Sequence, residues 1–294
     1  LRIFCVSPTG RTEKCWGKKY VSSLCHELTR VRILHTGSDM KAAVLYEFNQ
    51  PIEVRDVEQE PPKSGEVRVR MNAAGICASD HHVITGEAVF PLPLVLGHEG
   101  SGTVVEVGDG VSRVKPGDRC VLSFVSSCGH CRLCSAGKQQ LCEVHHSANS
   151  VQSDGTLRLH DGEQQLYQMH KLGVFAEYIV APEQSCYPIP DEVSMEVAAL
   201  IGCSVTTGVG TVINCPVSKP GMTVAVFGCG GVGLNVIQGA RLVNASRIIA
   251  VDVWDHKLEF AYKFGATDVI NAIAEDSVEK IIEITGGGVD YAFD

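Results

Sequence analysis

The chain has 294 residues, of which 45% are apolar and 20% are charged, so it is long enough for two globular domains that each bury a core. Its net charge is −9 at pH 7, and the acidic excess lies in residues 40–294, which hold 18 basic and 31 acidic side chains. An acidic body disfavours a nucleic-acid partner, because such binding depends on neutralising phosphates. No apolar run reaches the roughly 20 residues that cross a bilayer, so we expect no membrane span.

Residues 1–39 show no sustained period of 2 or 3.6, whereas a strand pattern, MKAAVLYEF, begins at Met40. We interpret residues 1–39 as an extension that is non-native or disordered. The alternative is a targeting segment, because basic residues outnumber acidic ones there, but Glu13, Glu27 and Asp39 weaken it. The apolar core of a signal peptide is not seen at this end, and we expect a cytoplasmic protein.

From residue 40 to residue 204, short apolar or alternating segments are separated by turns rich in Gly and Pro, such as KPGD at residues 115–118. The expected strands are Ile52–Asp56, Glu66–Ala73, Thr103–Val107, Arg119–Leu122 and Ala176–Val180. This pattern predicts a small, barrel-like β domain.

Within this domain, the stretch CGHCRLCSAGKQQLC contains Cys128, Cys131, Cys134 and Cys142. Four thiolates on a short loop suit a closed structural zinc site, because zinc takes four sulfur ligands at about 2.3 Å in a tetrahedron. Disulfides are the alternative, but cysteines three positions apart reach bridge geometry only through a strained turn. A nucleic-acid zinc module would need basic surroundings, which the acidic composition does not provide.

The pattern changes at Thr223. The apolar strand TVAVFG is followed by glycines, a helix-length stretch and the strand RIIAVD, and further strands are expected at Asp268–Ile270 and Val289–Phe293. Alternating strands and helices of this kind predict a parallel, doubly wound α/β sheet.

The glycines of this β-α-β unit satisfy the pattern G-x-G-x-x-G, which lets the backbone approach a pyrophosphate at a helix N-terminus. Asp252 ends the next strand, where it can accept hydrogen bonds from the adenosine ribose and would repel a 2′-phosphate, so we expect NAD rather than NADP. Lys257 either flanks that ribose or is an ordinary helix lysine in solvent. The residues assigned to the cofactor turn are Gly228, Gly230, Gly231, Val232 and Gly233.

Three further motifs are GICASDHH (75–82), LGHEGSG (96–102) and GCSVTTG (202–208). Together with the four-cysteine stretch and the β-α-β unit, in this order from Met40 to Asp294, they make the chain resemble the zinc-dependent medium-chain alcohol dehydrogenases. The resemblance implies a GroES-like β-barrel catalytic domain at residues 40–204 and a Rossmann NAD-binding domain at residues 205–294.

By this resemblance, Cys77, His98 and Cys203 are expected to hold a catalytic zinc and to leave its fourth position open for water or substrate. The four-cysteine stretch would hold a second, structural zinc. Asp80 and Glu99 are expected to orient the ligands and tune the metal, although Glu99 is alternatively a structural acid.

The expected reaction is the oxidation of a small alcohol to an aldehyde or ketone by hydride transfer to NAD. The resemblance implies that the proton leaves through Ser79 and the cofactor ribose to His82, whose ordinary pKa of about 6.5 suits exchange with solvent. Thr207 matches a position that packs on the nicotinamide. Phe124 matches one that lines the substrate pocket, and it could equally be a core residue.

The chain departs from the family pattern at three points. Ala78 stands where several members carry a basic residue for the pyrophosphate, so we expect weaker NAD binding. His146 stands where the glutathione-dependent formaldehyde dehydrogenase branch has an arginine, which leaves S-(hydroxymethyl)glutathione open as an alternative substrate. The chain stops at Asp294, about 80 residues before a six-stranded sheet would be complete, so an inactive zinc-binding fragment is another alternative. For the intact protein we expect a homodimer or homotetramer.

Overall fold

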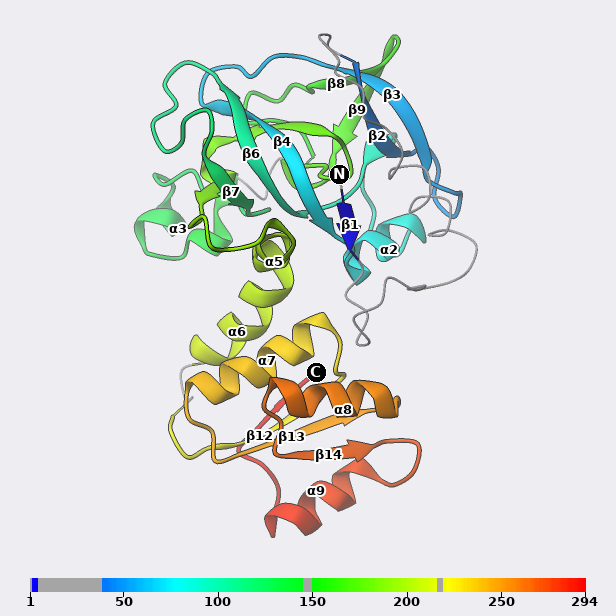
Figure 1. Ribbon diagram of the computed structural model, residues 1–294, viewed down its shortest axis with the longest axis vertical. Helices are drawn as coiled ribbons and strands as arrows, with labels where there is room; N and C mark the ends of the chain where they lie inside the picture. Colours follow the sequence, from blue (N-terminus) through cyan, green and yellow to red (C-terminus); the bar gives the residue numbers. More distant parts are fainter. Residues whose placement is uncertain (1, 5–38, 145–149, 216–218) are drawn as a thin grey trace. The chain divides into compact units, whose positions relative to one another are not determined.

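The structure is a computed structural model that describes residues 2–4, 39–144, 150–215 and 219–294. The chain divides into two compact units, with the boundary between Gly202 and Cys203. In Figure 1 the β-rich first unit runs from blue to yellow-green, and the second, α/β unit runs from yellow-green at its first helix to red. The boundary predicted from the sequence, between residues 204 and 205, lies two residues later.

Five strands of the first unit close into a barrel, in the order β2-β3-β8-β9-β5. Their bounds are β2 (Asp39–Leu45), β3 (Glu53–Gln59), β5 (Leu94–Val95), β8 (Leu159–Asp161) and β9 (Gln164–Gln168). The side chains from Ala42 to Leu45 are 0% exposed, as are Leu159 and Leu166, which face each other across β8 and β9. The barrel is therefore filled by small and branched apolar side chains, as a small barrel requires.

A six-stranded sheet packs with this barrel in one core, in the order β1-β4-β6-β7-β11, and β10 also pairs with β4. Its strands are β1 (Arg2–Phe4), β4 (Glu66–Gly75), β6 (Glu99–Val107), β7 (Arg119–Leu122), β10 (Tyr178–Pro182) and β11 (Cys186–Pro188). The antiparallel pair β4 and β6 brings Gly75 opposite Glu99. This pairing places the two motifs at residues 75–82 and 96–102 next to each other.

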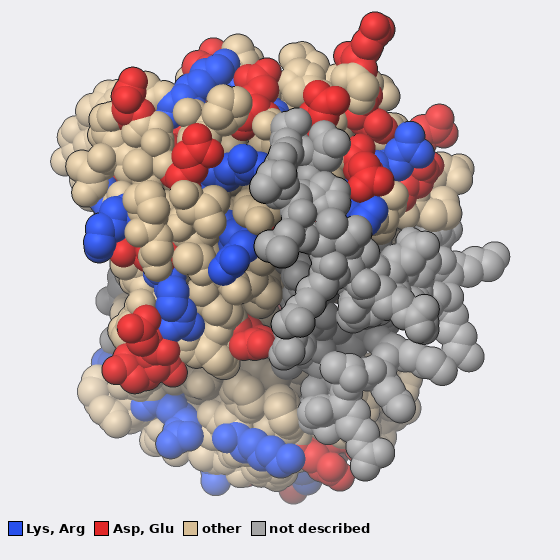
Figure 2. Space-filling model, turned by 45° about the horizontal axis from the view of Figure 1, so that its top comes forward, with Lys and Arg blue, Asp and Glu red and all other residues tan. Residues whose placement is uncertain are grey.

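Helices of the first unit are short and lie at strand ends. They are α2 (Ala78–Ile84), α3 (Arg132–Ser135), α5 (Met195–Leu200) and the 3-10 turns Gln139–Leu141, Met169–Lys171 and Glu183–Ser185. In the view of Figure 2, acidic and basic side chains are interspersed over the described surface of one face. A mixed surface of this kind does not provide the basic stripe that phosphate backbones need.

The second unit is a parallel sheet in the order β14-β13-β12-β15, with helices between successive strands (Figure 1). Its elements are α6 (Thr206–Ile213), β12 (Thr223–Phe227), α7 (Gly231–Leu242), β13 (Arg247–Asp252), α8 (Asp255–Phe264), β14 (Asp268–Asn271), α9 (Ser277–Thr285) and β15 (Tyr291–Phe293). Alternate residues of β12 and β13 enter two different apolar clusters, one on each face of the sheet. The near-continuous apolar strands TVAVF and RIIAVD follow from this burial on both faces.

The expected fold class, a GroES-like barrel domain and a Rossmann-type domain, is confirmed. The strands predicted at residues 119–122 and 247–252 have the predicted bounds. β6 begins four residues earlier than predicted, because Glu99 to Gly102 are buried against β4 despite their polar and glycine-rich sequence. Arg2–Phe4 form a strand, β1, inside the segment expected to be an extension, while residues 5–38 lie outside the described part of the chain.

One helical run, Met195–Ile213, is long and apolar enough by length and composition to cross a membrane, with 19 residues and a mean hydropathy of 1.6. The expectation of no membrane span stays a prediction, because these two measures alone do not show that the helix lies in a membrane. A single such helix is weak evidence for a membrane protein, because core helices of other proteins also meet them. Two of its glycines pack on protein: a Cβ added to Gly202 would lie 2.1 Å from the Leu122 carbonyl oxygen, and one added to Gly208 would lie 2.5 Å from the Val232 carbonyl oxygen.

Candidate active site and cofactor loop

A buried carboxylate, Asp80, connects the two motifs at the start of α2 and β6. One oxygen of Asp80 accepts a hydrogen bond of 2.9 Å from the Cys77 N–H, which closes the first turn of α2. The other oxygen lies 3.2 Å from Nδ1 of His98. Asp80 is 1% exposed, so both contacts are shielded from water. Because Asp80 contacts Nδ1, a metal ion at this site would be bound through the opposite ring nitrogen of His98.

The donor atoms of Cys77, His98 and Glu99 lie within 4.8 Å of one another. His98 and Glu99 are each 2% exposed, and Gly75 leaves room for the Glu99 side chain, since a Cβ there would lie 2.3 Å from its Oε2. This set of soft thiolate and imidazole donors, with a carboxylate beside them, has the chemistry of a zinc site.

The His98 imidazole is electrostatically tuned by its neighbours. Burial lowers its pKa, but hydrogen bonds and charge from Asp80 and Cys77 outweigh burial and raise the pKa to about 10. A zinc ligand must be the neutral imidazole, so zinc binding at this site has to release a proton.

Aromatic rings flank His98. The ring of Phe124 lies 5.7 Å from that of His98, and the ring of His170 lies 5.8 Å from it, both near perpendicular. Phe124, predicted to line the substrate pocket or to belong to the core, is partly buried against the core of the first unit. His170 and the neighbouring Phe90 were missed by sequence reasoning, because no local pattern connects residues 90, 124 and 170.

The two residues of the expected proton path, Ser79 and His82, lie on α2, and both are exposed. Ser79 Oγ lies 3.7 Å from the Cys77 sulfur, and His82 Nε2 lies 3.9 Å from the Glu87 carboxylate. Ala78, the first residue of α2, is also exposed. The helix thus carries a hydroxyl beside the thiolate and an imidazole in contact with solvent. His146, another position at which the chain departs from the family pattern, lies outside the described residues.

Cys203, the third expected zinc ligand, is the first residue of the second unit and lies in a π-helical turn, Ile201–Val205. π-helical turns inside a helix are uncommon and are frequent at functional sites. The residue before it, Gly202, packs on the Leu122 carbonyl in the first unit. Cys203 therefore directly follows a residue, Gly202, that is packed tightly within the first unit.

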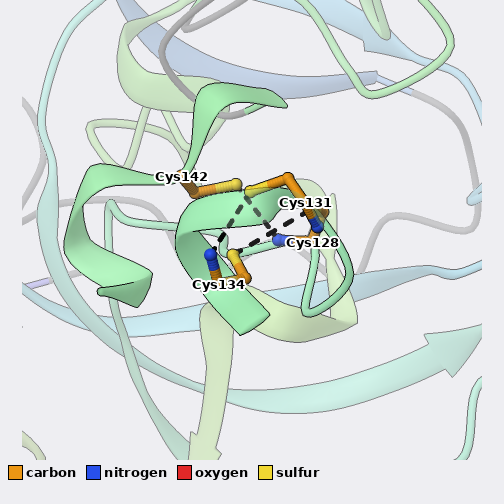
Figure 3. A group of neighbouring side chains, drawn as sticks. All are labelled: Cys128, Cys131, Cys134 and Cys142. Carbon is orange, nitrogen blue, oxygen red and sulfur yellow. Dashed lines mark hydrogen bonds between the residues drawn. The ribbon is translucent and has the colours of Figure 1, made fainter. Parts of the chain in front are cut away.

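The four-cysteine lobe, Cys128, Cys131, Cys134 and Cys142, brings its sulfurs within 4.8 Å of one another (Figure 3). Backbone N–H groups point at three of the sulfurs: Cys128 N–H donates to Cys142, Cys131 N–H to Cys128, and Cys134 N–H to Cys131, at 3.3, 3.3 and 3.4 Å. The cysteines are free thiols, which fits a metal site better than disulfides. Four sulfur donors this close together can fill all four positions of one zinc ion, as in a closed structural site.

Hydrogen bonds set the acidity of the lobe thiols. The N–H groups of Cys134 and Glu143 lower the pKa of Cys131 to about 6, whereas burial and the neighbouring thiols raise the pKa of Cys134 to about 12. A cation bound by all four sulfurs would favour the thiolate at every position.

The glycine-rich turn of the second unit joins β12 to α7. Gly228 has φ +85, and Gly230 caps α7, whose first residues are Gly231, Val232 and Gly233. A Cβ at Gly233 would lie 1.8 Å from the Gly228 carbonyl oxygen, so no other residue fits there. The first backbone N–H groups of α7 are left for a phosphate group.

Asp252 ties this turn to the end of β13. One carboxylate oxygen accepts the Cys229 N–H at 2.8 Å, and the other accepts the N–H groups of Val253 and Trp254 at 2.8 and 3.1 Å. Lys257 Nζ lies 3.7 Å from the first oxygen. A carboxylate accepts about four hydrogen bonds, so one position on Asp252 is left for a ribose hydroxyl. Thr207, expected on the nicotinamide side, lies in the first turn of α6.

Comparisons with known proteins identify the family of the chain. Two family models match the chain: "Alcohol dehydrogenase GroES-like domain" at residues 63–191 and "Zinc-binding dehydrogenase" at residues 231–294. An S-(hydroxymethyl)glutathione dehydrogenase of Saccharomyces cerevisiae is 41% identical, covering 86% of this chain and 68% of its own length. One of Synechocystis is 42% identical, covering 86% and 70%.

Solved structures give the same picture. Benzyl alcohol dehydrogenase of Acinetobacter calcoaceticus superposes with a TM-score of 0.80 at 34% identity, over 86% of this chain and 70% of that one. An alcohol dehydrogenase of Escherichia coli complexed with NADH gives 0.71 at 31% identity, over 87% and 69%. A zinc-binding dehydrogenase of Sinorhizobium meliloti bound to NADP gives 0.72 at 32% identity, again over 87% and 69%.

Proposed function

The chain belongs to the zinc-dependent medium-chain alcohol dehydrogenase family, and we propose that it oxidises a small primary or aromatic alcohol with NAD. Family membership makes it a zinc-dependent oxidoreductase that uses a nicotinamide dinucleotide. The observation that carries the proposal is the buried Asp80–His98 contact beside the Cys77 thiol, because a ligand histidine oriented by a carboxylate is what a catalytic zinc needs.

The proposed catalytic ligands are Cys77, His98 and Cys203. Two thiolates and one neutral imidazole give a site of about zero net charge with zinc, and three protein ligands leave one position open. When bound, the metal supplies a Lewis acid for the alcohol oxygen, and the nicotinamide accepts a hydride. Glu99 holds a negative charge next to the ligands, where it tunes their environment. Cys128, Cys131, Cys134 and Cys142 are proposed to hold the second, structural zinc.

The residues of α2 are proposed to carry the proton away from the reacting alcohol. Ser79, beside the Cys77 sulfur, takes this proton while its own hydroxyl proton moves on, and His82, exposed to solvent, releases a proton to water. The Glu87 carboxylate lies 3.9 Å from Nε2 of His82, next to the point at which the proton would reach solvent.

The proposed cofactor is NAD rather than NADP. Asp252 holds a negative charge at the end of β13, and its one remaining acceptor position suits a ribose hydroxyl and not a phosphate. Gly228, Gly230, Gly231, Val232 and Gly233 are proposed to bind the pyrophosphate, Lys257 to flank the ribose, and Thr207 to pack on the nicotinamide.

A second candidate substrate is S-(hydroxymethyl)glutathione, because two relatives at 41% and 42% identity carry that activity in their names. The two candidates differ in charge, since the glutathione adduct brings carboxylates that a small alcohol lacks.

The experiment is an NADH absorbance assay of the zinc-loaded protein with benzyl alcohol, ethanol or S-(hydroxymethyl)glutathione. Turnover of the free alcohols supports the proposal, and turnover of the adduct alone supports the second candidate. A Cys77→Ser protein serves as the control for background reduction of NAD. Absence of turnover with all three would overturn the proposed function. We further propose a homodimer or homotetramer in the cytoplasm, which light scattering and cell fractionation test.

A further inference from the structure

Two buried cysteines of the first unit, Cys120 and Cys186, belong to neither of the proposed zinc sites. They lie on the paired antiparallel strands β7 and β11, where Cys120 is opposite Pro188. Cys186 is opposite Leu122, two positions further along β7. Residues two apart on a strand point to the same face, so the two cysteines are diagonal neighbours on one face of the strand pair. Both are 0% exposed, and both belong to the core cluster that contains Leu122.

The two thiols influence each other directly. Cys120 Sγ donates to the Gly102 carbonyl at 3.5 Å. Hydrogen bonding with the Cys120 side chain, and then burial, raise the pKa of the Cys186 thiol well above its usual range, while charge from Arg113 opposes this rise. The Cys186 thiol therefore stays protonated while the strand pair is closed, and only a thiolate reacts readily with oxidants.

The strand that carries Cys186 is the easier of the two to open. β11 has three residues and lies at one end of the six-stranded sheet. Its other residues, Tyr187 and Pro188, are exposed, and a proline has no N–H for the strand ladder. Short, exposed strands of this kind open locally at a lower free-energy cost than the core. The Arg113 guanidinium lies 5.0 Å from the centre of the Tyr187 ring, where its charge favours the Cys186 thiolate once solvent reaches it.

We propose that Cys120 and Cys186 are a modification site, which hydrogen peroxide converts to a disulfide that links β7 to β11. The Cys186 thiolate attacks one peroxide oxygen, the O–O bond breaks, and hydroxide leaves, so that Cys186 becomes a sulfenic acid. The Cys120 sulfur then attacks the sulfur of Cys186. The S–S bond forms, the S–O bond breaks, and the hydroxyl group leaves as water with the Cys120 proton. In sum, the two thiols lose two electrons and two protons, and the peroxide is reduced to two water molecules.

The disulfide closes the long stretch of chain between residues 120 and 186, which contains the four-cysteine lobe. Closing a long loop stabilises the folded state, because the unfolded chain loses conformational entropy. The link lies next to the point at which β7 leads into the lobe, since the Ser123 N–H donates to the Ser185 carbonyl at 2.8 Å. Oxidation at this pair therefore stabilises the first unit and uses none of the zinc ligands.

The test treats the zinc-loaded protein with hydrogen peroxide under mild warming, blocks the remaining thiols with iodoacetamide, and maps the peptides by tandem mass spectrometry. We expect a cross-link between Cys120 and Cys186 and a rise in melting temperature of about 5 °C, both reversed by dithiothreitol. Cys215→Ser is the matched control, because Cys215 is a partly exposed cysteine outside both zinc sets. This control protein should keep the cross-link and the rise in melting temperature.

Two variants, Cys120→Val and Cys186→Val, keep an apolar side chain in the core, and each should lose both the cross-link and the rise in melting temperature. If a variant does not fold, the peptide map of the unmodified protein still decides the question. Recovery of Cys120 and Cys186 as two alkylated thiols, or as two separate sulfinic acids, would overturn the inference. So would a rise in melting temperature that persists in both variants, because the stabilisation would then come from another part of the chain.

Discussion

The four-cysteine lobe and the Cys77–His98 cluster, both in the first unit, differ in what surrounds their sulfurs. In the lobe, three sulfurs accept backbone N–H groups from the same short segment. At Cys77 the backbone N–H goes instead to Asp80, whose other oxygen holds a ring 18 residues further along the chain. The lobe is thus a local structure stabilised by its own backbone, whereas the second site depends on the pairing of β4 with β6. A locally built site suits a structural ion, and a site assembled by the fold can leave a position open for chemistry.

The largest expected effect is the loss of activity on changing the Cys77–His98 cluster. In Cys77→Ser we expect alcohol oxidation to fall roughly a thousandfold, because the Lewis acid is no longer held. The melting temperature should change little, since the backbone contact from residue 77 to Asp80 remains. The NADH assay measures the rate, and calorimetric melting measures the change in melting temperature. A variant that kept its full rate would show that Cys77 is not a ligand.

In the four-cysteine lobe we expect a substitution to lower the stability of the fold, which the change at Cys77 leaves nearly unaltered. Cys131→Ser removes a sulfur that accepts the Cys134 N–H, and with it the structural zinc. We expect the unfolding free energy to fall by on the order of 3 kcal/mol, a value typical for loss of a metal site. Calorimetric melting checks this, with Cys215→Ser as the control because Cys215 belongs to neither cysteine set. Unchanged melting would contradict a structural role for the lobe.

A smaller effect is expected from the carboxylate that orients His98. Asp80→Asn keeps an oxygen for the Cys77 N–H but loses the charge beside the imidazole. We expect zinc affinity at this site to fall about 10- to 100-fold, while the lobe zinc is unaffected. Competition with a chelator measures the two affinities, and Glu106→Gln, a charge loss elsewhere on β6, is the control. Equal losses at both sites would mean that Asp80 acts only on overall stability.

The pH dependence of the metal-free protein gives a related prediction. The pKa of His98 is raised to about 10 by Asp80 and Cys77, from an ordinary value of 6.5. A raised pKa in the folded state adds stability that is fully present below pH 6.5 and is lost as the pH rises toward 10. We therefore expect the metal-free protein to melt at a lower temperature at pH 9.5 than at pH 6.5. In Asp80→Asn the difference should shrink, and an equal difference in both proteins would contradict the assignment.

The smallest effect concerns the second unit. In Asp252→Asn the negative charge that faces the adenosine ribose is lost, and we expect the preference for NAD over NADP to fall about tenfold. Binding of both cofactors, followed by NADH and NADPH fluorescence, measures the ratio. Asp255→Asn, three residues later on α8, is the control, because its carboxylate is hydrogen-bonded to Asn271. An unchanged ratio would show that Asp252 does not determine the preference for NAD over NADP.

Local patterns predicted much of this molecule. The cysteine spacing in residues 128–142 was sufficient to predict that the four sulfurs of the lobe lie together. Its donors and its backbone hydrogen bonds all come from one segment. The apolar strands and the glycine turn of the second unit could also be predicted from the sequence, because parallel strands buried on both faces have a distinctive composition. The strand Arg247–Asp252 has the predicted bounds, and a helix follows the glycine turn as predicted.

Features that depend on tertiary structure were not predictable in the same way. The start of β6 at Glu99 was missed because its polar residues are buried only through pairing with β4. Asp80 could be identified through the family resemblance, but its simultaneous contact with Cys77 and His98 could not. The ring contacts of His170 with Phe90, His98 and Phe124 were missed, because left-handed backbone at a histidine leaves no trace in the sequence pattern.

The most direct test of two differently built zinc sites is native mass spectrometry of the purified, folded chain. The account predicts two zinc ions per chain, one of which is lost in Cys77→Ser and the other in Cys131→Ser. A single zinc ion that survives Cys77→Ser and disappears in Cys131→Ser would contradict it, because the cluster at Cys77 and His98 would then not be a metal site.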